Sequence, residues 1–178
     1  MRRITWALIL GILLILILIA IIFVYYATAV NNIKPEIKNP ISENTGSEII
    51  IGEEHISYLL NEIGAYKLHA PPLSNDMPKI NLRVDELEFK TEIDIGYPRT
   101  NTGKWDKADI KITTTKQEVI AAIKSNPKEY MKNSVSFGKT GIELLGGYTD
   151  LFSKGYLTLY QDLTGKSFTG SVIRIFAS

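Results

Sequence analysis

The chain of 178 residues contains two histidines, which are its candidates for acid–base or metal chemistry near neutral pH. His55 follows Glu53 and Glu54 at the start of an expected helix, a place typical of a solvated residue at a helix end. Neither His55 nor His69 has the spacing of a metal-binding motif. We therefore expect no metal site and interpret His55 as a solvated surface residue.

Two short fragments are similar to phosphate-binding loops, Gly138-Lys139-Thr140 and Gly165-Lys166-Ser167. A phosphate-binding loop also needs a first glycine five residues before the second one. Asn133 and Tyr160 stand at those positions, so the backbone that would surround a phosphate is missing. We expect each fragment to be a turn that follows a helix.

Carboxylate pairs are the remaining candidates for catalysis, because two carboxylates in different environments can act as acid and base. The pairs are Asp85-Glu86 and Glu92 with Asp94. Glu92 and Asp94 alternate on the polar side of an expected strand, where charges keep a sheet face soluble. The chain has no cysteine and no Gly-x-Ser-x-Gly sequence, which excludes thiolate and serine-elbow catalysis. We expect a protein that is not an enzyme and needs no cofactor.

A long apolar segment precedes all of these residues. Ile4 to Val30 carry no charge, and fifteen of the seventeen residues from Leu8 to Val24 are Ile, Leu, Phe or Val. Their insertion into a bilayer gains about 5 to 9 kcal/mol. Trp6 and Tyr25 would lie about 28 Å apart on a helix, which matches the thickness of a hydrocarbon core. We predict a transmembrane signal-anchor helix over residues 1–30.

The alternative to a retained anchor is a cleaved signal peptide, since Ala27-Thr28-Ala29 has the form of a cleavage site. The apolar run is longer than that of a signal peptide, which favours the anchor. Arg2 and Arg3 precede the segment, so we expect a single-pass protein with a cytoplasmic N-terminus and an extracytoplasmic C-terminal domain.

The rest of the chain is long enough for one domain. Residues 31–47, with Pro35, Pro40 and Gly46, are typical of a linker, and we assign residues 48–178 to the domain. Beyond the anchor, eighteen Lys and Arg balance nineteen Asp and Glu, so no basic surface is expected and nucleic acid is excluded as a partner. The bilayer is the expected partner.

Apolar spacing predicts an α+β domain. A helix is expected over residues 53–63, strands over 80–84 and 87–95, a long hairpin loop over 96–106, and a third strand over 108–112, in an antiparallel arrangement. Thr115 and Glu118 form a capping box, and Asn126-Pro127 begins a second helix. A strand from about Ile142, an aromatic helix over 149–163 and a last strand over 172–176 follow.

Three surfaces could contact a ligand or a partner. An apolar face of the sheet and aromatic helix could hold a lipid-like ligand, a solid core being the alternative reading. Its residues are Leu82, Val84, Phe89, Ile93, Ile110, Ile112, Phe152 and Tyr156. The expected long loop presents Tyr97, Arg99 and Trp105, which could contact lipid headgroups or a protein. Residues 138–148 could be an edge strand open to pairing.

The sequence Lys107-Ala108-Asp109-Ile110-Lys111-Ile112-Thr113, followed by two helices and the strand Gly138-Lys139-Thr140-Gly141-Ile142-Glu143-Leu144, resembles the sterol-carrier-protein type 2 lipid-binding domain. This resemblance implies an antiparallel or mixed five-stranded sheet covered by helices, with an apolar tunnel for fatty-acyl or sterol ligands. The membrane anchor, the long loop before Lys107 and Leu145-Gly146-Gly147 depart from that family.

We therefore expect a membrane-anchored, non-catalytic domain that binds a lipid or another apolar small molecule at the extracytoplasmic face. The alternative is a structural or scaffold subunit of a cell-envelope assembly, such as a pilin-like protein, whose partners are other envelope proteins. A pilin would carry a charged leader ending in a small residue, whereas Arg3 here directly precedes Ile4.

Overall fold

The computed structural model describes residues 10–21, 33–41, 49–71 and 73–166, which belong to two compact units, 1–32 and 33–178. In the first unit, residues 10–21 form a helix whose side chains are exposed. Within the described ranges no helix has both the length and the apolar character needed to cross a bilayer. The predicted anchor over residues 1–30 extends past both ends of the described helix and stays a prediction.

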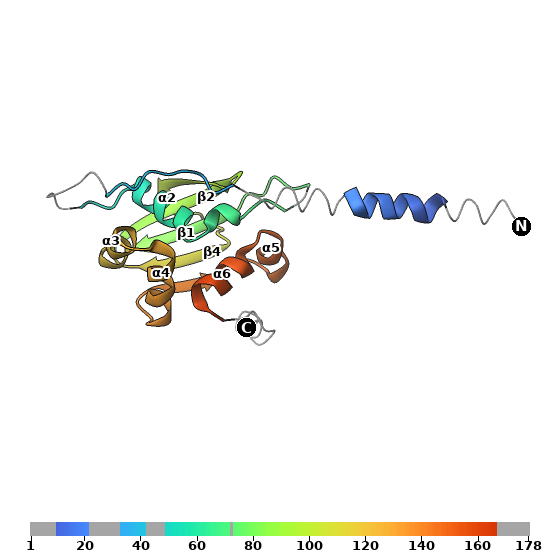
Figure 1. Ribbon diagram of the computed structural model, residues 1–178. Coiled ribbons are helices and arrows are strands. Elements are labelled where there is room, and N and C mark those ends of the chain that lie inside the picture. Colours follow the sequence, from blue (N-terminus) through green and yellow to red (C-terminus); the bar gives the residue numbers. More distant parts are fainter. Residues whose placement is uncertain (1–9, 22–32, 42–48, 72, 167–178) are drawn as a thin grey trace, which may run out of the picture. The chain divides into compact units, whose positions relative to one another are not determined.

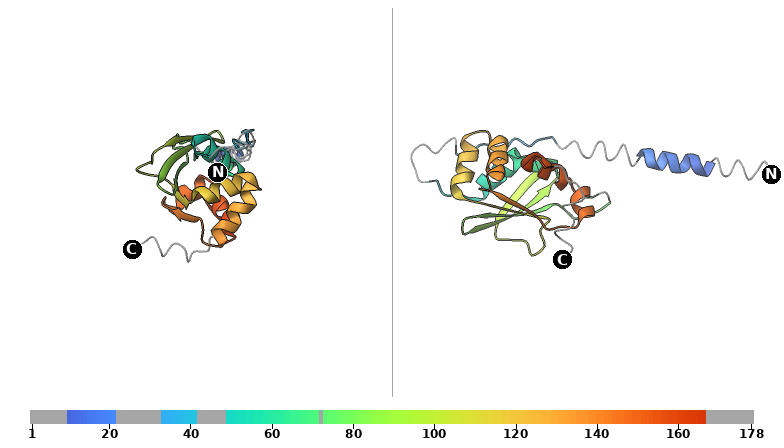
Figure 2. Two further views of the ribbon diagram at one scale, coloured as in Figure 1. Left: turned by 90° about the vertical axis from the view of Figure 1, so that its left-hand side faces the viewer. Right: turned by 90° about the horizontal axis from the view of Figure 1, so that it is seen from below.

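The second unit is an α+β domain with a five-stranded mixed sheet in the order β3-β2-β1-β4-β5, which confirms the α+β part of the predicted fold class (Figure 1). The strands are β1 Lys79–Val84, β2 Leu87–Asp94, β3 Tyr97–Thr102, β4 Ile110–Thr114 and β5 Gly141–Leu144. The helices are α2 Glu53–Glu62, the 3-10 turn η1 Ala65–Lys67, α3 Lys116–Lys124, α4 Pro127–Ser136, α5 Tyr148–Ser153 and α6 Tyr156–Thr164. The helices gather on one face of the sheet (Figure 2).

The region 97–102 is a strand, so the prediction of a long hairpin loop over residues 96–106 was wrong there. β3 pairs antiparallel with β2, with Pro98 opposite Ile93. A proline lacks the N–H that a central strand needs, but β3 is the edge of the sheet and bonds to one neighbour only. The turn between the two strands consists of Ile95 and Gly96, both with positive φ.

The strand predicted over residues 108–112 is β4, and its antiparallel placement was also wrong. β4 pairs with β1 in parallel, Ile80 opposite Ile110 and Val84 opposite Thr114. β5 pairs antiparallel with β4 at the other edge. β5 therefore is the predicted edge strand.

Two helices stand where one was predicted over residues 149–163. Gly155 has a φ of +86°, which a continuous α-helix cannot contain, and it separates α5 from α6. The helix starts at Thr115 and Asn126 are confirmed, because their side chains accept from the backbone N–H of Glu118 and Glu129. The strand predicted over 172–176 lies outside the described residues.

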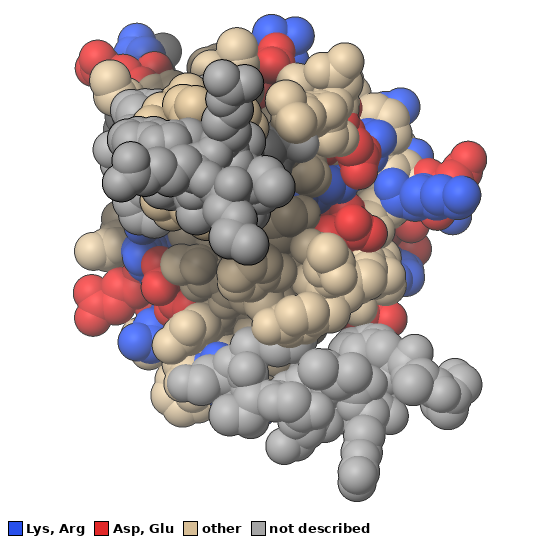
Figure 3. Space-filling model, turned by 90° about the vertical axis from the view of Figure 1, so that its right-hand side faces the viewer, with Lys and Arg blue, Asp and Glu red and all other residues tan. Residues whose placement is uncertain are grey.

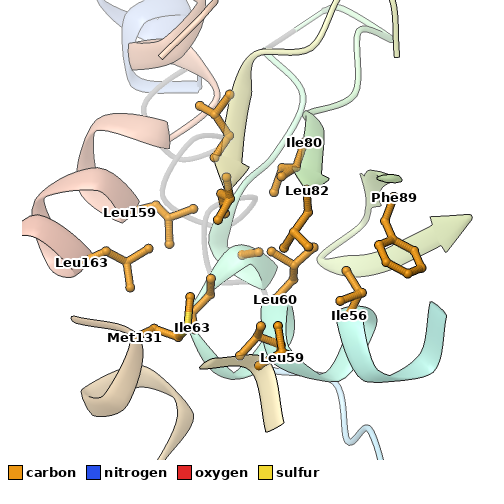
Figure 4. Close-up of a cluster of buried hydrophobic side chains, with 14 of the residues drawn as sticks. Ile56, Leu59, Leu60, Ile63, Ile80, Leu82, Phe89, Met131, Leu159 and Leu163 are labelled. Atoms are coloured by element: carbon orange, nitrogen blue, oxygen red, sulfur yellow. The ribbon is translucent and has the colours of Figure 1, made fainter. Parts of the chain in front are cut away.

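The core lies between the inner face of the sheet and the helices (Figure 4). α2 contributes one face of its helix, as its apolar spacing predicted, and faces β1 and β2. α6 and α4 close the other side with Leu159, Leu163 and Met131. The buried α2 residues are Ile56, Leu59, Leu60 and Ile63.

Part of the predicted linker 31–47 is held against the domain. The Asn61 side chain donates to the carbonyl oxygen of Pro35 over 2.9 Å, and Lys34 pairs with Glu62 over 2.7 Å. Further along, Asn39 donates to the carbonyl oxygen of Ile123 at the end of α3. These contacts attach residues 34–39 to α2 and α3.

Candidate functional site

The predicted ligand-binding residues do not form one surface. The six from the strands are 0–3% exposed and belong to the packed core, and so does Tyr156. Phe152 instead is 67% exposed on α5. The structure thus brings the six strand residues together on the inner sheet face, and their role in ligand binding stays a prediction. They are Leu82, Val84, Phe89, Ile93, Ile110 and Ile112.

The three predicted contact residues of the loop also separate. Tyr97 and Arg99 lie on β3, where Arg99 pairs with Asp94 over 2.7 Å. Trp105 instead is fixed to the sheet, because its indole N–H donates to the carbonyl oxygen of Thr91. The ammonium groups of Lys79 and Lys90 lie 5.7 and 5.1 Å from the centre of its ring.

His55 is buried, so its interpretation as a solvated residue was wrong. Its Nδ1 accepts a hydrogen bond from the backbone N–H of Gly52 over 3.2 Å and caps α2. Its Nε2 makes no hydrogen bond within the described residues. The His55 side chain therefore stabilises the start of α2.

The strand ends define a second region, which we call the Ile95 end of the sheet. β1 and β4 begin there, because they run parallel, and β2 and β5 end there, because each is antiparallel to one of them. The turn with Ile95 closes β2 to β3 at the same end. The opposite end, where β4 ends and β5 begins after Phe137, is called the Phe137 end.

A pocket of about 570 Å³ lies at the Ile95 end, between the starts of β1 and β4 and the helix α5. Its walls carry both signs of charge together with a small apolar part at Leu145 and Ala108. Its lining residues are Asp76, Lys79, Asp106, Lys107, Ala108, Asp109, Leu145, Gly146, Asp150 and Lys154.

Asp109 forms the centre of the pocket's buried side. Its Oδ1 accepts from the Lys154 ammonium over 2.9 Å. Its Oδ2 accepts from the backbone N–H of Lys79 over 2.7 Å and from the Tyr156 hydroxyl over 3.1 Å. Lys154 also pairs with Asp76 over 2.7 Å and is 2% exposed. The carboxylate thus joins the first residue of β1 to the junction of α5 and α6.

The protonation of these groups follows from their surroundings. Burial lowers the pKa of the Lys154 ammonium, but its bonds to Asp76 and Asp109 outweigh burial and leave this pKa raised. Burial, and then the charge of Asp109, raise the pKa of the Tyr156 hydroxyl well above its ordinary value. The bond from Lys154 lowers the pKa of Asp76. Lys154 is therefore an ammonium and Tyr156 a neutral phenol at physiological pH.

The rim of the pocket differs from this neutralised floor. Within the described residues, Asp106, Lys107 and Asp150 form no ion pair and are exposed. These groups are available to a charged ligand.

An apolar surface adjoins the pocket. Leu145 lines the pocket and is itself exposed. On α5 the exposed rings of Tyr148 and Phe152 stack, with 6.3 Å between their centres. Polar pocket and apolar surface therefore adjoin. Figure 3 looks onto this end, where uncharged side chains occupy much of the middle.

The sequence predictions missed this pocket. Alternation placed Asp109 on the polar face of its strand with Lys111, whereas it lies just before β4 and turns inward. One signal was present: Lys154 is a single charge between Leu151 and Tyr156, in a segment predicted to be apolar and helical. A buried ammonium needs an acidic partner, which only the folded chain identifies.

No family model and no curated protein matches this chain. Among solved structures, a double mutant of the sec-alkylsulfatase PisA1 has a TM-score of 0.38 and 15% identity, with 67% of this chain and 17% of that one covered. The ubiquinone synthesis protein UbiJ-SCP2 has a TM-score of 0.34 and 11% identity, covering 64% and 92%. Sterol carrier protein 2 like 2 from Aedes aegypti has 0.31 and 14%, covering 56% and 92%.

Two of these three structures are sterol-carrier-protein 2 domains, the family that the sequence resembles. The chain spans about a sixth of the length of the alkylsulfatase. With TM-scores below 0.5, none of these likenesses assigns a fold family or a function to this chain.

Proposed function

We propose that this chain is a membrane-anchored, non-catalytic domain that binds a lipid or another amphiphilic ligand at the extracytoplasmic face, with the ligand's polar headgroup in the pocket at the Ile95 end. The observation that carries the proposal is the continuity at Leu145 between a charged pocket and exposed apolar side chains. An amphiphile needs both kinds of surface next to each other.

The charges support a headgroup with a phosphate or a similar anion. Lys154 is neutralised by Asp76 and Asp109, so it has little attraction left for a ligand. Lys107 on the rim forms no ion pair in the described part of the chain and can bind an anionic oxygen. Asp106 and Asp150, also exposed, suit an amine carried by the same headgroup.

Binding without catalysis is supported by the protonation of the pocket floor. A lysine nucleophile or base requires a lowered pKa. The pKa of Lys154 is raised, and that of Tyr156 is raised well above its ordinary value. Both groups hold their protons, as expected of residues that stabilise the fold.

The proposal is tested with the full chain in phosphatidylcholine nanodiscs that contain a phospholipid with a diazirine next to its phosphate. After illumination, mass spectrometry should find the label on residues 106–109 and 145–154. K107E should lower this labelling roughly two- to fivefold, because a partly exposed ion pair contributes up to about 1 kcal/mol. K132E, which reverses an exposed charge on α4 away from the pocket, should leave it unchanged.

Equal labelling of K107E, K132E and the unchanged chain would contradict a headgroup in the pocket. Absence of label from both peptides would contradict lipid binding at this end of the sheet.

A scaffold role in an envelope assembly is a second candidate, favoured by the position of β5. This strand is an edge of the sheet and pairs with β4 alone among the described strands. An edge can add a strand of another protein. Crosslinking in native membranes should then give discrete, reproducible products that contain residues 141–144, whereas a lipid-binding domain needs none.

A further inference from the structure

Ile95 and Leu73 combine two features that do not help the isolated domain. Both have a positive φ, of 48° and 58°, which a side chain with a Cβ rarely adopts and which is least suited to the β-branched Ile95. Both side chains are exposed, Ile95 to 88%. Residues with a strained backbone cluster at functional positions.

The Ile95 end also collects most of the exposed apolar side chains. Ten large hydrophobic side chains are exposed in the described part of residues 33–166. Seven of them lie on segments at the Ile95 end, and three lie toward the other end. The seven are Ile33, Leu73, Ile95, Tyr97, Leu145, Tyr148 and Phe152, and the three are Ile50, Leu87 and Phe137. The difference indicates that the Ile95 end meets an apolar environment.

The chain enters the domain at the same end. α2 runs antiparallel to β3, because Glu53 bonds to Thr102 and Ser57 to Thr100, so the last turn of α2 lies toward the start of β3. Asn61 and Glu62 in that turn hold Pro35 and Lys34. Lys34 therefore lies at the Ile95 end.

Chain length then limits how far this end can stand from a bilayer. Lys34 stands four positions after Val30, the last residue of the uncharged segment. An extended chain covers at most about 3.6 Å per residue, so these positions reach about 14 Å. If the apolar segment lies in the bilayer, chain length therefore limits Lys34 to about 14 Å from the end of that segment.

We infer that the Ile95 end of the domain rests in the interface of a phospholipid bilayer, with Ile95 and Leu73 inserted between lipid headgroups. The inference rests on the membrane anchor of the proposed function and adds the orientation of the domain and the residues that enter the lipid. Insertion removes from water the side chains that the domain leaves exposed.

The two ends of β2 provide the test. Leu87 is its first residue and Ile95 follows its last, so their Cα atoms are about 26 Å apart along the strand. The chain has no cysteine, so I95C and L87C each give a single attachment site for a nitroxide label. In phosphatidylcholine vesicles, electron paramagnetic resonance compares collisions with oxygen, which enriches in lipid, and with a water-soluble nickel complex.

The label at position 95 should collide more with oxygen and less with nickel than the label at position 87. F152C and F137C form a second pair, since both phenylalanines are well exposed and lie at opposite ends of the sheet. Ile95 lies at the same end of the sheet as the pocket but is not one of its lining residues, so a label at position 95 is not attached to the pocket wall.

Two results overturn the inference. If the chain is anchored but labels at 95 and 152 are as accessible to nickel as those at 87 and 137, the orientation is wrong while the proposed lipid binding stands. If the full chain separates from vesicles in a flotation gradient, the membrane anchor itself fails, and both proposals fail with it.

Discussion

Lys154 and Asp109 form a buried ion pair, with 2.9 Å between Nζ and Oδ1, although 45 positions of the chain separate them. The pair attaches the junction of α5 and α6 to the start of β4. Asp109 also bonds to the backbone N–H of Lys79, so one carboxylate holds the two parallel strands and the helical C-terminal part together.

K154M should strongly destabilise the domain. Methionine keeps much of the side-chain volume but leaves the Asp109 carboxylate buried without its cation, which costs about 3–5 kcal/mol. Denaturant unfolding followed by circular dichroism measures the free energy. R99M is the control: it removes an ion pair whose arginine is largely exposed, and should cost about 1 kcal/mol or less. Equal losses in the two variants would show that Lys154 adds nothing beyond a surface charge.

Stability should fall when the pH rises above about 10. The folded-state pKa values of Lys154 and Tyr156 are raised above their ordinary values of 10.5 and 10.0. A raised pKa means that the folded state holds the proton more tightly, so its stabilisation is complete below the unfolded pKa and is lost as the pH rises through the folded pKa. Unfolding free energies at pH 8, 10 and 11 should therefore decrease.

Y156F separates the contribution of the hydroxyl group. The phenylalanine ring keeps the packing but cannot titrate, so the decrease between pH 10 and 11 should be smaller than in the unchanged chain. An identical pH dependence in Y156F would show that Tyr156 is not responsible. The lowered pKa of Asp76 acts in the opposite direction, and its stabilisation is lost as the pH falls below about 4.

A buried chain of hydroxyl groups at the Phe137 end gives a prediction for Ser134. Its hydroxyl donates to the Glu118 carboxylate over 2.7 Å and lies 2.7 Å from the Thr140 hydroxyl, which in turn meets Thr114. Each hydroxyl has one proton and the ionised carboxylate only accepts, so the donors run from Thr114 through Thr140 and Ser134 to Glu118. Glu118 thus binds Ser134 instead of completing the predicted capping box.

S134A should cost about 1–3 kcal/mol in unfolding free energy, because it leaves the buried Oε2 of Glu118 without its donor and the hydroxyl proton of Thr140 without its acceptor. S136A, in the same helix and exposed, should change it by less than about 0.5 kcal/mol. Thermal or denaturant unfolding distinguishes the two. If S134A leaves the unfolding free energy unchanged, water has replaced the hydroxyl group.

Local signals in the sequence predicted much of this fold. Residues with a period of 3.6 marked α2, alternation marked β1 and β2, and Thr115 and Asn126 marked two helix starts. Each of these depends on neighbours in the chain. The parallel pairing of β1 with β4 depends on residues far apart, and alternation alone does not distinguish it from the antiparallel meander that was predicted.

The site was harder to predict for the same reason. Pro98 suggested a loop, because a proline is excluded from central strands. It is allowed in β3 because β3 is an edge strand, which the sequence did not show. Asp109 and Lys154 form part of the site only because they pair with each other, and the sequence does not show that pairing. Ile95 was predicted as the apolar end of a strand, and its positive φ follows from a two-residue turn that the sequence did not reveal.

I95N should stabilise the isolated fold while it weakens contact with lipid. The turn Ile95-Gly96 has positive φ at both residues, where Asn-Gly is the preferred sequence and asparagine adopts the left-handed conformation far more readily than isoleucine. The side chain is 88% exposed, so little packing is lost. The unfolding free energy should rise by about 1 kcal/mol. L87N, at the other end of β2 and without a positive φ, should give no such gain. A lower stability of I95N in denaturant unfolding would mean that Ile95 is held by packing within the domain, which would also remove the reason to place it in lipid.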